Sequence, residues 1–397
     1  MFPFTLDEYQ TRLAKTKEKM ANWGVDVLLV TDPANMNYLS GFNGWSFYVH
    51  QMLVILIDEE QPIWLGRGMD ANVAKQTTWL MHERIIPYPD HYVQSESQHP
   101  MDFIGKILTD IGQSTRRIGV EMETYYYSAK AHERLLASLP NASFQDASNL
   151  VNWVRLIKSD TEITYMKHAG IIAAKAMYAG MNAIRAGARE CDVVADIYHA
   201  QISGTEEVGG DYPAIVPLLP SGIKTSAPHI TWTDQRYPNE ETVIIELAGC
   251  HQRYHAPLAR TITIGKPQQR VIDMAHIVVE GLNEVLAFIK PGVSCEETEA
   301  VWQKTINRYG VSKDSRLGYS TGLNYPPDWG EHTASLRKGD KTILQENMAL
   351  HVIPGMWFDD FGVEISETIR VTDNGCELLC DFPRQLLSND PNIHSAS

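Results

Sequence analysis

The sequence predicts an α+β protein with two domains, a smaller N-terminal α/β domain and a larger C-terminal domain. Over about the first 150 residues, short apolar runs alternate with helix-length segments, which is typical of a small mixed sheet with helices around it. The second half has longer helices, and its end is rich in strand-like segments. A chain of 397 residues is long enough to bury a core in each domain.

The N-terminal domain is expected to span residues 1–153. Thr5 and Glu8 predict a capping box at the start of its first helix. An apolar run ends at Asp32-Pro33, a pair that stops a strand. The remaining elements expected in this domain are strands at 25–30, 52–57, 63–65, 84–86 and 118–120, with helices near 101–112 and 127–138.

The C-terminal domain is expected to span residues 154–387, and a polar tail follows at 388–397. Two capping boxes, Ser159 with Glu162 and Ser294 with Glu297, each predict the start of a helix. The other elements expected here are helices near 190–203 and 269–289, and strands near 242–248, 259–264, 349–354 and 363–372.

The composition excludes several classes of partner. The chain has 34 basic and 49 acidic residues, and its net charge of −15 argues against nucleic acid and anionic membranes. Five scattered cysteines, an odd number, indicate reduced thiols. Because no segment has the apolar length of a signal peptide or a membrane span, we expect a cytoplasmic protein.

Four short phrases follow one another in an informative order. They are AsnTyrLeuSerGlyPhe ending at Phe42, IleGlyValGlu ending at Glu121, ArgLeuIleLysSer ending at Ser159, and SerGlyIleLysThrSerAlaProHis ending at His229. With these phrases the chain resembles the pita-bread superfamily of methionine aminopeptidase, prolidase and creatinase over nearly its whole length. The resemblance implies a creatinase/prolidase-like N-terminal domain, a pita-bread catalytic domain and a homodimer.

The sequence departs from that superfamily at the five positions that would hold two metal ions. Where the resemblance implies Asp, Asp, His, Glu and Glu, this chain has Glu246, Pro257, Tyr319, Ile353 and Ser366. Hard divalent ions need several oxygen or imidazole ligands that converge on one point, and Pro and Ile side chains offer none. We therefore expect a hydrolase scaffold without the metal centre, and no other cofactor.

Two longer segments, residues 319–331 and 359–367, resemble ectoine hydrolases, a metal-free group within the superfamily. This resemblance implies a small-molecule substrate, the cyclic amidine ectoine, which is opened to N-acetyl-L-2,4-diaminobutyrate. The likeness to creatinase is weaker, because Val49 stands where creatinase has an Arg that binds the carboxylate of creatine. Hydrolysis of another amidine or guanidine remains an alternative.

Glu246 is the expected centre of the site. It lies within ValIleIleGluLeuAla, an apolar strand in which a carboxylate needs a partner. At a position where the superfamily builds its active site, the carboxylate can attract an amidinium and add to its central carbon. It can also act only as a base for water, and the simplest alternative is a buried structural ion pair.

A histidine is expected to carry the protons of such a reaction. The resemblance places His229 beside the scissile bond, where it would protonate the leaving nitrogen and deprotonate water. The alternative is an ordinary surface histidine that follows Ala227-Pro228. His255, nine residues after Glu246, is a second candidate near the substrate.

Glu364, Glu367 and Tyr319 complete the expected catalytic group. On a straight strand Glu364 and Glu367 would face opposite sides, so only a bulge could bring both into one pocket. Tyr319 stands at the position of the lost ligand histidine, and its hydroxyl could bond the substrate or Glu246. A core tyrosine is the alternative.

Four further residues are expected at the substrate. Aromatic faces hold a flat cation well, which favours Phe47, Tyr212 and Trp329 as parts of the pocket wall, although core packing is the simpler role for each. Arg260 could bind a substrate carboxylate, or it could be structural. Two other functions stay open for the whole chain, a dimetal Xaa-Pro peptidase and a non-catalytic pita-bread binding module.

Overall fold

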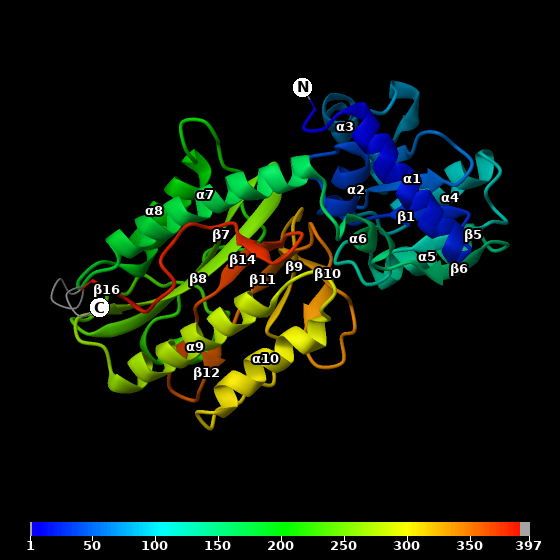
Figure 1. Ribbon diagram of the computed structural model, residues 1–397. Coiled ribbons are helices and arrows are strands. Elements are labelled where there is room, and N and C mark those ends of the chain that lie inside the picture. The colour runs from blue at the N-terminus through cyan, green and yellow to red at the C-terminus, as the bar shows by residue number, and fades with distance from the viewer. Residues whose placement is uncertain (1, 390–397) are drawn as a thin grey trace. The chain divides into compact units, whose positions relative to one another are not determined.

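The structure, a computed structural model, describes residues 2–389 and consists of two compact units. The first unit ends at Arg155 and the second begins at Leu156, whereas the sequence predicts a boundary between residues 153 and 154. Figure 1 shows the helices and strands of both units. The predicted tail lies outside the described residues from position 390 onward.

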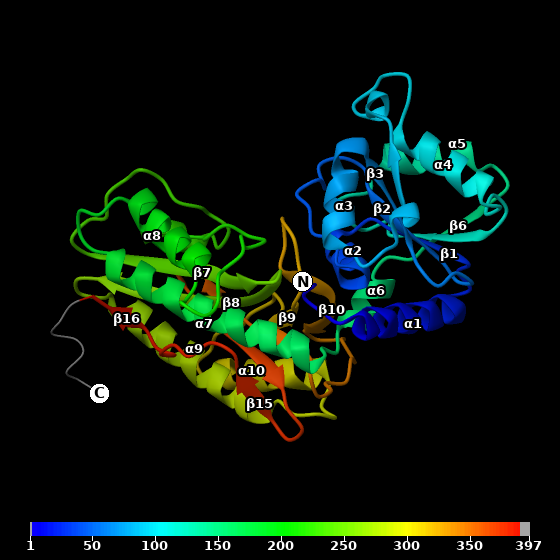
Figure 2. The same cartoon turned by 90° about the horizontal axis from the view of Figure 1, so that it is seen from above.

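The N-terminal unit is built on a six-stranded mixed sheet with the order β4-β3-β2-β1-β5-β6. Strand β2 is antiparallel to β1 and to β3, and the other neighbouring pairs are parallel. Figure 2 shows α4 and α5 on one face of this sheet and α1 on the other. The strands are β1 Val27–Val30, β2 Met52–Leu56, β3 Ile63–Arg67, β4 Ile85–Tyr88, β5 Arg117–Val120 and β6 Ser143–Asp146, and the helices are α1 Leu6–Trp23, α2 Pro33–Ser40, α3 Ala71–Thr77, α4 Pro100–Asp110, α5 Ala129–Ser138 and α6 Leu150–Arg155.

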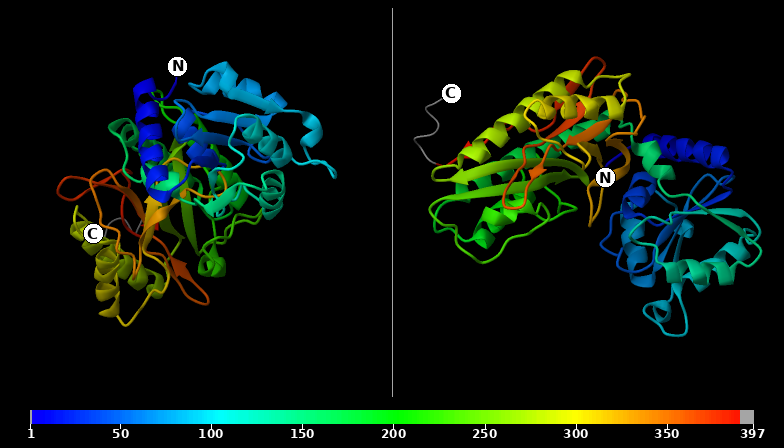
Figure 3. Two further views of the ribbon diagram at one scale, coloured as in Figure 1. Left: turned by 90° about the vertical axis from the view of Figure 1, so that its right-hand side faces the viewer. Right: turned by 90° about the horizontal axis from the view of Figure 1, so that it is seen from below.

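The C-terminal unit places strands between two pairs of helices. Figure 1 shows α7 and α8 on one side and α9 and α10 on the other, and the right-hand view of Figure 3 shows the second pair lying side by side. The helices are α7 Asp160–Ala183, α8 Glu190–Ser203, α9 Gln269–Phe288 and α10 Cys295–Asn307. This is the expected α+β architecture, with an α/β unit followed by a pita-bread unit.

Two main sheets carry the strands of the C-terminal unit. A five-stranded sheet has the order β10-β9-β11-β14-β15, and a three-stranded sheet has the order β16-β8-β7. A separate pair joins β12 and β13. The strands are β7 Glu241–His251, β8 Tyr254–Ile264, β9 Gly318–Thr321, β10 Gly330–Leu336, β11 Ala349–Val352, β12 Met356–Trp357, β13 Gly362–Val363, β14 Glu367–Val371, β15 Cys376–Leu378 and β16 Leu387–Ser388.

The predicted helix starts are confirmed in the C-terminal unit. Ser159 at α7 and Ser294 at α10 each form a complete capping box with the glutamate three residues later. The start of α1 differs, because Thr5 caps the helix while the Glu8 carboxylate accepts a hydrogen bond from Arg12 at 2.8 Å. The Glu8 carboxylate thus pairs with Arg12 and does not complete the capping box with the Thr5 backbone N–H.

The predicted strand at 363–372 is interrupted at residues 364–366. The backbone leaves β13 at this point and bonds to β8: the Ser366 N–H donates to Ala259 O at 3.1 Å, and Glu364 N–H donates to Thr261 Oγ1 at 2.8 Å. Strand β14 begins only at Glu367. The detour joins the two main sheets, and the residues that form it lie in the candidate site.

No helix among residues 2–389 is long and apolar enough to cross a membrane.

Candidate active site

Glu246 lies in the middle of β7 and faces away from the helices α7 and α8. Its backbone bonds Leu218, and its cross-strand neighbour on β8 is Ala259. The adjacent residues Ile245 and Leu247 point to the opposite face and join the core that packs against those helices. Strand alternation therefore presents Glu246 on the same face as Ala248, where Trp329 and Tyr319 also pack.

Two buried carboxylates dominate the electrostatics of this face. Glu246 is 6% exposed, and no hydrogen bond to its side chain is formed by the residues that the structure describes. Burial, then the charges of Glu364 and Asp328, raise the pKa of Glu246 well above its usual value. Burial likewise raises the pKa of Glu364 to about 7. Both oxygens of Glu364 are buried and, within residues 2–389, have no hydrogen-bond partner.

A buried lysine supplies the positive charge that acts on Glu364. Lys313 lies in the loop before β9, donates from Nζ to Gly355 O at 2.6 Å and sits 4.2 Å over the Trp357 ring. Burial lowers the pKa of Lys313 to about 8, against the opposing effect of Glu364. Lys313 is not predictable from the sequence, because its loop has no motif that distinguishes it from a surface lysine.

A chain of hydrogen bonds crosses the five-stranded sheet beside the carboxylates. Trp329 Nε1–H donates to the Tyr319 hydroxyl at 2.8 Å, and that hydroxyl lies 3.0 Å from Nδ1 of His351. His351 Nε2 lies 2.8 Å from Ser366 Oγ, which also accepts from the Ala259 N–H at 2.7 Å. The chain follows the strand order, because β11 places His351 between β9 and β14.

Tyr319 and Ser366 therefore interact through His351, a residue that is not among those predicted from the sequence. His351 is fully buried, and burial lowers its pKa to about 3, so that it is neutral at physiological pH. Burial, and next the charge of Glu246, raise the pKa of Tyr319 well above its usual value. The available signal was a lone polar residue within AlaLeuHisValIle, the same kind of signal that identified Glu246.

Glu364 and Glu367 do not converge, in spite of the interrupted strand. Glu367 Oε1 accepts from Arg260 at 2.8 Å and from Arg384 at 3.0 Å, and both Arg260 and Glu367 are fully buried. Arg260 also donates to three backbone carbonyls besides its own neighbour's, those of Pro383, Ser366 and Phe382. Alternation along β8 turns Arg260 to the face opposite Ala259. The structure thus gives Arg260 and Glu367 a structural ion pair, in place of the predicted substrate and catalytic contacts.

The two candidate histidines have very different surroundings. His229 is exposed on the turn after the 3₁₀ helix Gly222–Ser226, and the neighbouring Ile230 is hydrogen-bonded to Leu219, next to the residue that bonds Glu246. His255 is fully buried. Its Nε2 accepts from the Ala214 N–H at 2.9 Å, and burial lowers its pKa well below the usual value. His255 therefore fixes the backbone of the 214 loop against β8, a supporting role.

The predicted aromatic residues occupy separate places. Trp329 is fully buried and belongs to the group that surrounds Glu246. Tyr212 packs under the guanidinium of Arg253, which lies 3.9 Å from its ring centroid. Phe47 belongs to the N-terminal unit, where it contacts Trp45 and Tyr126.

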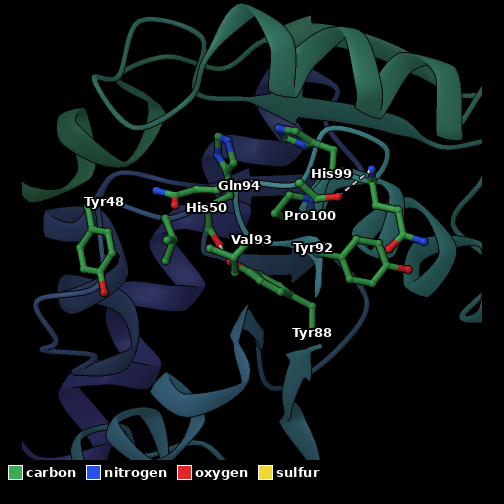
Figure 4. Close-up of a pocket in the computed structure, with 11 residues that line it drawn as sticks. Tyr48, His50, Tyr88, Tyr92, Val93, Gln94, His99 and Pro100 are labelled. Carbon is green, nitrogen blue, oxygen red and sulfur yellow. Dashed lines mark hydrogen bonds between the residues drawn. The ribbon is translucent and has the colours of Figure 1, made fainter. Parts of the chain in front are cut away.

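A pocket of the N-terminal unit lies along the segment that follows Phe47. Its wall includes Tyr48, His50, Tyr88 and His99, as Figure 4 shows. The rings of His50 and His99 lie 4.8 Å apart, and burial followed by the neighbouring His99 lowers the pKa of His50 to about 4. The aromatic and imidazole lining differs from the carboxylate-rich face around Glu246.

The residues at the five superfamily ligand positions do not fit a two-metal centre. Pro257 and Ile353 have no donor atom, and the oxygens of Tyr319 and Ser366 are held by Trp329, His351 and the Ala259 N–H. Only Glu246 keeps a carboxylate there. Within residues 2–389, no group of three or more His, Cys, Asp or Glu side chains is placed to hold a metal ion.

Comparison with known proteins identifies the scaffold. The sequence matches metallopeptidase family M24 over residues 164–373 and the creatinase/prolidase N-terminal domain over residues 12–157. It is 45% identical to an ectoine hydrolase of Halomonas elongata, over 97% of this chain and 98% of the relative. It is 44% identical to an uncharacterised hydrolase/peptidase of Sinorhizobium fredii, over 98% and 99% of the two chains.

Solved structures show the same fold. The prolidase of Pyrococcus horikoshii aligns with a TM-score of 0.80 at 24% identity, over 95% of this chain and all of that one. A prolidase of Thermococcus sibiricus aligns with a TM-score of 0.83 at 19% identity, over 96% of this chain and 99% of that one. At these identities the likeness concerns the architecture.

Proposed function

Because the chain belongs to metallopeptidase family M24 and carries a creatinase/prolidase N-terminal domain, we propose that it is a C–N hydrolase that opens the ring of ectoine. The expected product is N-acetyl-L-2,4-diaminobutyrate. The observation that carries the proposal is the pair of buried carboxylates, Glu246 and Glu364, without hydrogen-bond partners among residues 2–389. A protonated cyclic amidine has one delocalised positive charge, which favours the ionised form of Glu246, while Lys313 supplies positive charge to Glu364.

Glu246 is the proposed nucleophile. One carboxylate oxygen forms a bond to the central amidinium carbon, and the positive charge of the amidinium and the negative charge of the carboxylate are lost together. A buried site of low dielectric favours this neutralisation. Cleavage of one ring C–N bond then leaves the former ring carbon attached to Glu246 as an imidate-type ester, and water attacks this carbon to release the N-acetyl product.

His229 is the proposed proton carrier. The departing ring nitrogen needs a proton, and the attacking water must lose one, so a single histidine can serve both steps in turn. His229 lies on an exposed turn, so its imidazole can exchange protons with solvent between turnovers. Tyr319 and Glu364 complete the proposed catalytic group, with Trp329 and Tyr212 as proposed aromatic contacts of the substrate.

The proposed chemistry is metal-independent. It rests on the chemical nature of the five ligand positions, of which only Glu246 offers a carboxylate. In a two-metal hydrolase the metal ions would activate a water molecule as the nucleophile. In the proposed reaction the Glu246 carboxylate is the nucleophile, so no metal-activated water is needed for the first step.

Turnover of ectoine, followed by proton NMR, tests the proposal. We expect ring opening by the wild-type protein and none by Glu246→Gln. If the wild-type protein consumes no ectoine under any buffer condition, the proposal that ectoine is the substrate is refuted. Binding of ectoine without turnover would favour a non-catalytic pita-bread module.

Rapid acid quenching distinguishes the nucleophile from a general base. In a variant in which hydrolysis of the adduct is slowed more than its formation, peptide mapping should find an addition of substrate mass at Glu246. Repeated absence of the adduct during measurable turnover would leave Glu246 as a base or as an anchor for the amidinium.

The proposed working form is a cytoplasmic homodimer. The five cysteines are free thiols, as in a reducing compartment. Light scattering at micromolar concentration should give a mass of about twice 44.7 kDa, and a monomer mass would contradict the dimer.

A further inference from the structure

The hydrogen-bond chain through His351 can be assigned one proton at a time. Its fixed donors are Trp329 Nε1–H, which points to the Tyr319 oxygen, and the Ala259 N–H, which points to Ser366 Oγ. Each hydroxyl has one proton of its own, and a neutral imidazole has a proton on only one nitrogen. The two possible tautomers of His351 therefore direct the hydroxyl protons in opposite directions.

The first tautomer has its proton on Nε2. His351 then donates to Ser366 Oγ and accepts the Tyr319 O–H at Nδ1. Ser366 Oγ would accept twice, from His351 and from Ala259, and its own proton would have no acceptor among the described residues. Because Ser366 is fully buried, leaving this donor without an acceptor is unfavourable.

The second tautomer has its proton on Nδ1. The Ser366 O–H donates to Nε2, and Nδ1–H donates to the Tyr319 oxygen, which also accepts from Trp329. Every buried donor within the chain then has an acceptor. Only the Tyr319 O–H has no acceptor within the chain, and of the two hydroxyl residues Tyr319 is less buried than Ser366. Tyr319 packs against Ala248 and Trp329 on the face of β7 that also carries Glu246, whose charge acts on this hydroxyl.

We propose that His351 and Ser366 position Tyr319 as a hydrogen-bond donor toward the carboxylate oxygens of Glu246, including the oxygen that bonds to the substrate carbon. The inference deepens the proposed function and rests on it for the chemistry. The hydroxyl oxygen is held by two donors, so its proton is available to the site and its orientation is fixed. In the second step, when water releases Glu246 from the former ring carbon, this donor stabilises the departing carboxylate.

The tautomer can be measured on the resting protein without substrate. Long-range proton–nitrogen correlation spectra of ¹⁵N-histidine-labelled protein distinguish a protonated Nδ1 from a protonated Nε2. The His351 signals are identified by their loss in His351→Asn, or by their shift in Ser366→Ala if the first variant does not fold. We expect a protonated Nδ1 and a bare Nε2, and the Nε2–H form or an imidazolium would overturn the assignment.

Kinetics then test whether His351 acts through Tyr319. We expect Tyr319→Phe and His351→Leu each to lower kcat about 10- to 100-fold with little change in KM, as for the loss of one strong hydrogen bond. In a Tyr319→Phe background, His351→Leu should cause little further loss, because its effect passes through the missing hydroxyl. His351→Asn, whose amide offers a donor near Nδ1, should retain more activity than His351→Leu.

Equal losses from His351→Leu in both backgrounds would show a merely structural role and refute the inference. The two parts fail separately. If ectoine is not consumed, the proposed function fails while the tautomer remains measurable, and if ectoine is consumed by a protein with the Nε2–H form, the inference alone fails.

Discussion

Glu364 and Glu367 are three residues apart, but they differ in what surrounds their charge. Glu367 is paired with Arg260 and Arg384, whereas the oxygens of Glu364 have no hydrogen-bond partner within residues 2–389. The first arrangement stabilises an ionised carboxylate, and the second disfavours it. Paired substitutions can therefore separate a structural glutamate from a functional one.

Glu364→Gln should stabilise the protein more at pH 8 than at pH 5. The pKa of Glu364 is raised from 4.5 to about 7, so the folded state holds its proton more tightly than the unfolded state. The stability that this group contributes is fully present below about pH 4.5 and is lost as the pH rises through about 7. Thermal unfolding at both pH values measures the effect, and a Tm difference from wild type that does not grow with pH would contradict it.

Glu367→Gln is the matched control, with the opposite expected result. It removes one partner of the fully buried Arg260 and leaves a charge without compensation, which typically costs about 3–5 kcal/mol. We expect a lower Tm at both pH values. A variant as stable as the wild type would show that the ion pair is not structural.

His229→Ala should lower kcat by about 10²–10⁴-fold, the range typical of a general acid or base, with a much smaller change in KM. Because His229 is exposed, its removal should leave the Tm unchanged. His276→Ala, at an exposed position of α9, is the control and should keep full activity. An unchanged kcat in the first variant would remove His229 from the mechanism.

At the scale of elements, the position of β7 depends on close packing against α7. A Cβ added at Gly249 would lie 1.9 Å from Ala169 O and 2.5 Å from the backbone nitrogen of Ala173, both in the helix. Glycine is therefore required for the strand to approach the helix backbone. The same contact fixes the segment of β7 that presents Glu246.

Gly249→Ala should destabilise the protein by about 1–3 kcal/mol, because helix and strand must separate to admit the methyl group. Turnover should fall as well, since Glu246 lies three residues away on the same strand. Gly209→Ala is the matched control, because a Cβ there has no heavy atom within 4 Å. Denaturant unfolding compares the two, and equal stabilities would contradict the packing argument.

The five-stranded sheet also explains why a broken strand is useful to the site. The interruption at residues 364–366 turns Ser366 toward β8, where it accepts from Ala259 and reaches His351. If β14 continued through Ser366, the backbone of Ser366 would pair with β11 and would not bond to Ala259 on β8. The local loss of regular pairing thus allows a link between the two sheets at the site.

At the scale of the whole molecule, this chain belongs to a metallopeptidase family, but the residues at its five ligand positions do not suit a two-metal centre. The purified protein is expected to contain no stoichiometric catalytic metal. Turnover of ectoine should survive dialysis against EDTA and should not rise on addition of Mn²⁺, Co²⁺ or Zn²⁺. The prediction would be contradicted if elemental analysis found about two divalent ions per chain and if activity were lost to the chelator and restored by metal.

The sequence by itself determined the features that depend on near neighbours in the chain. The capping boxes of α7 and α10 need residues only three positions apart, and the alternation that turns Glu246 away from the core is a property of one strand. The identity of the residues at the five ligand positions, and hence the poor fit to metal, is likewise contained in the sequence. So is the resemblance to the pita-bread superfamily, which the family comparison confirms.

Only the tertiary structure decided which polar residues are paired and which remain available. Arg260 and Glu367 are 107 residues apart in the chain, and Tyr319 and His351 are 32 apart, so no local pattern predicts either contact. Burial decided the rest, because a carboxylate without a partner and one between two arginines look alike in sequence. The physical reason is that desolvation and pairing depend on groups that the folded chain brings together from distant positions.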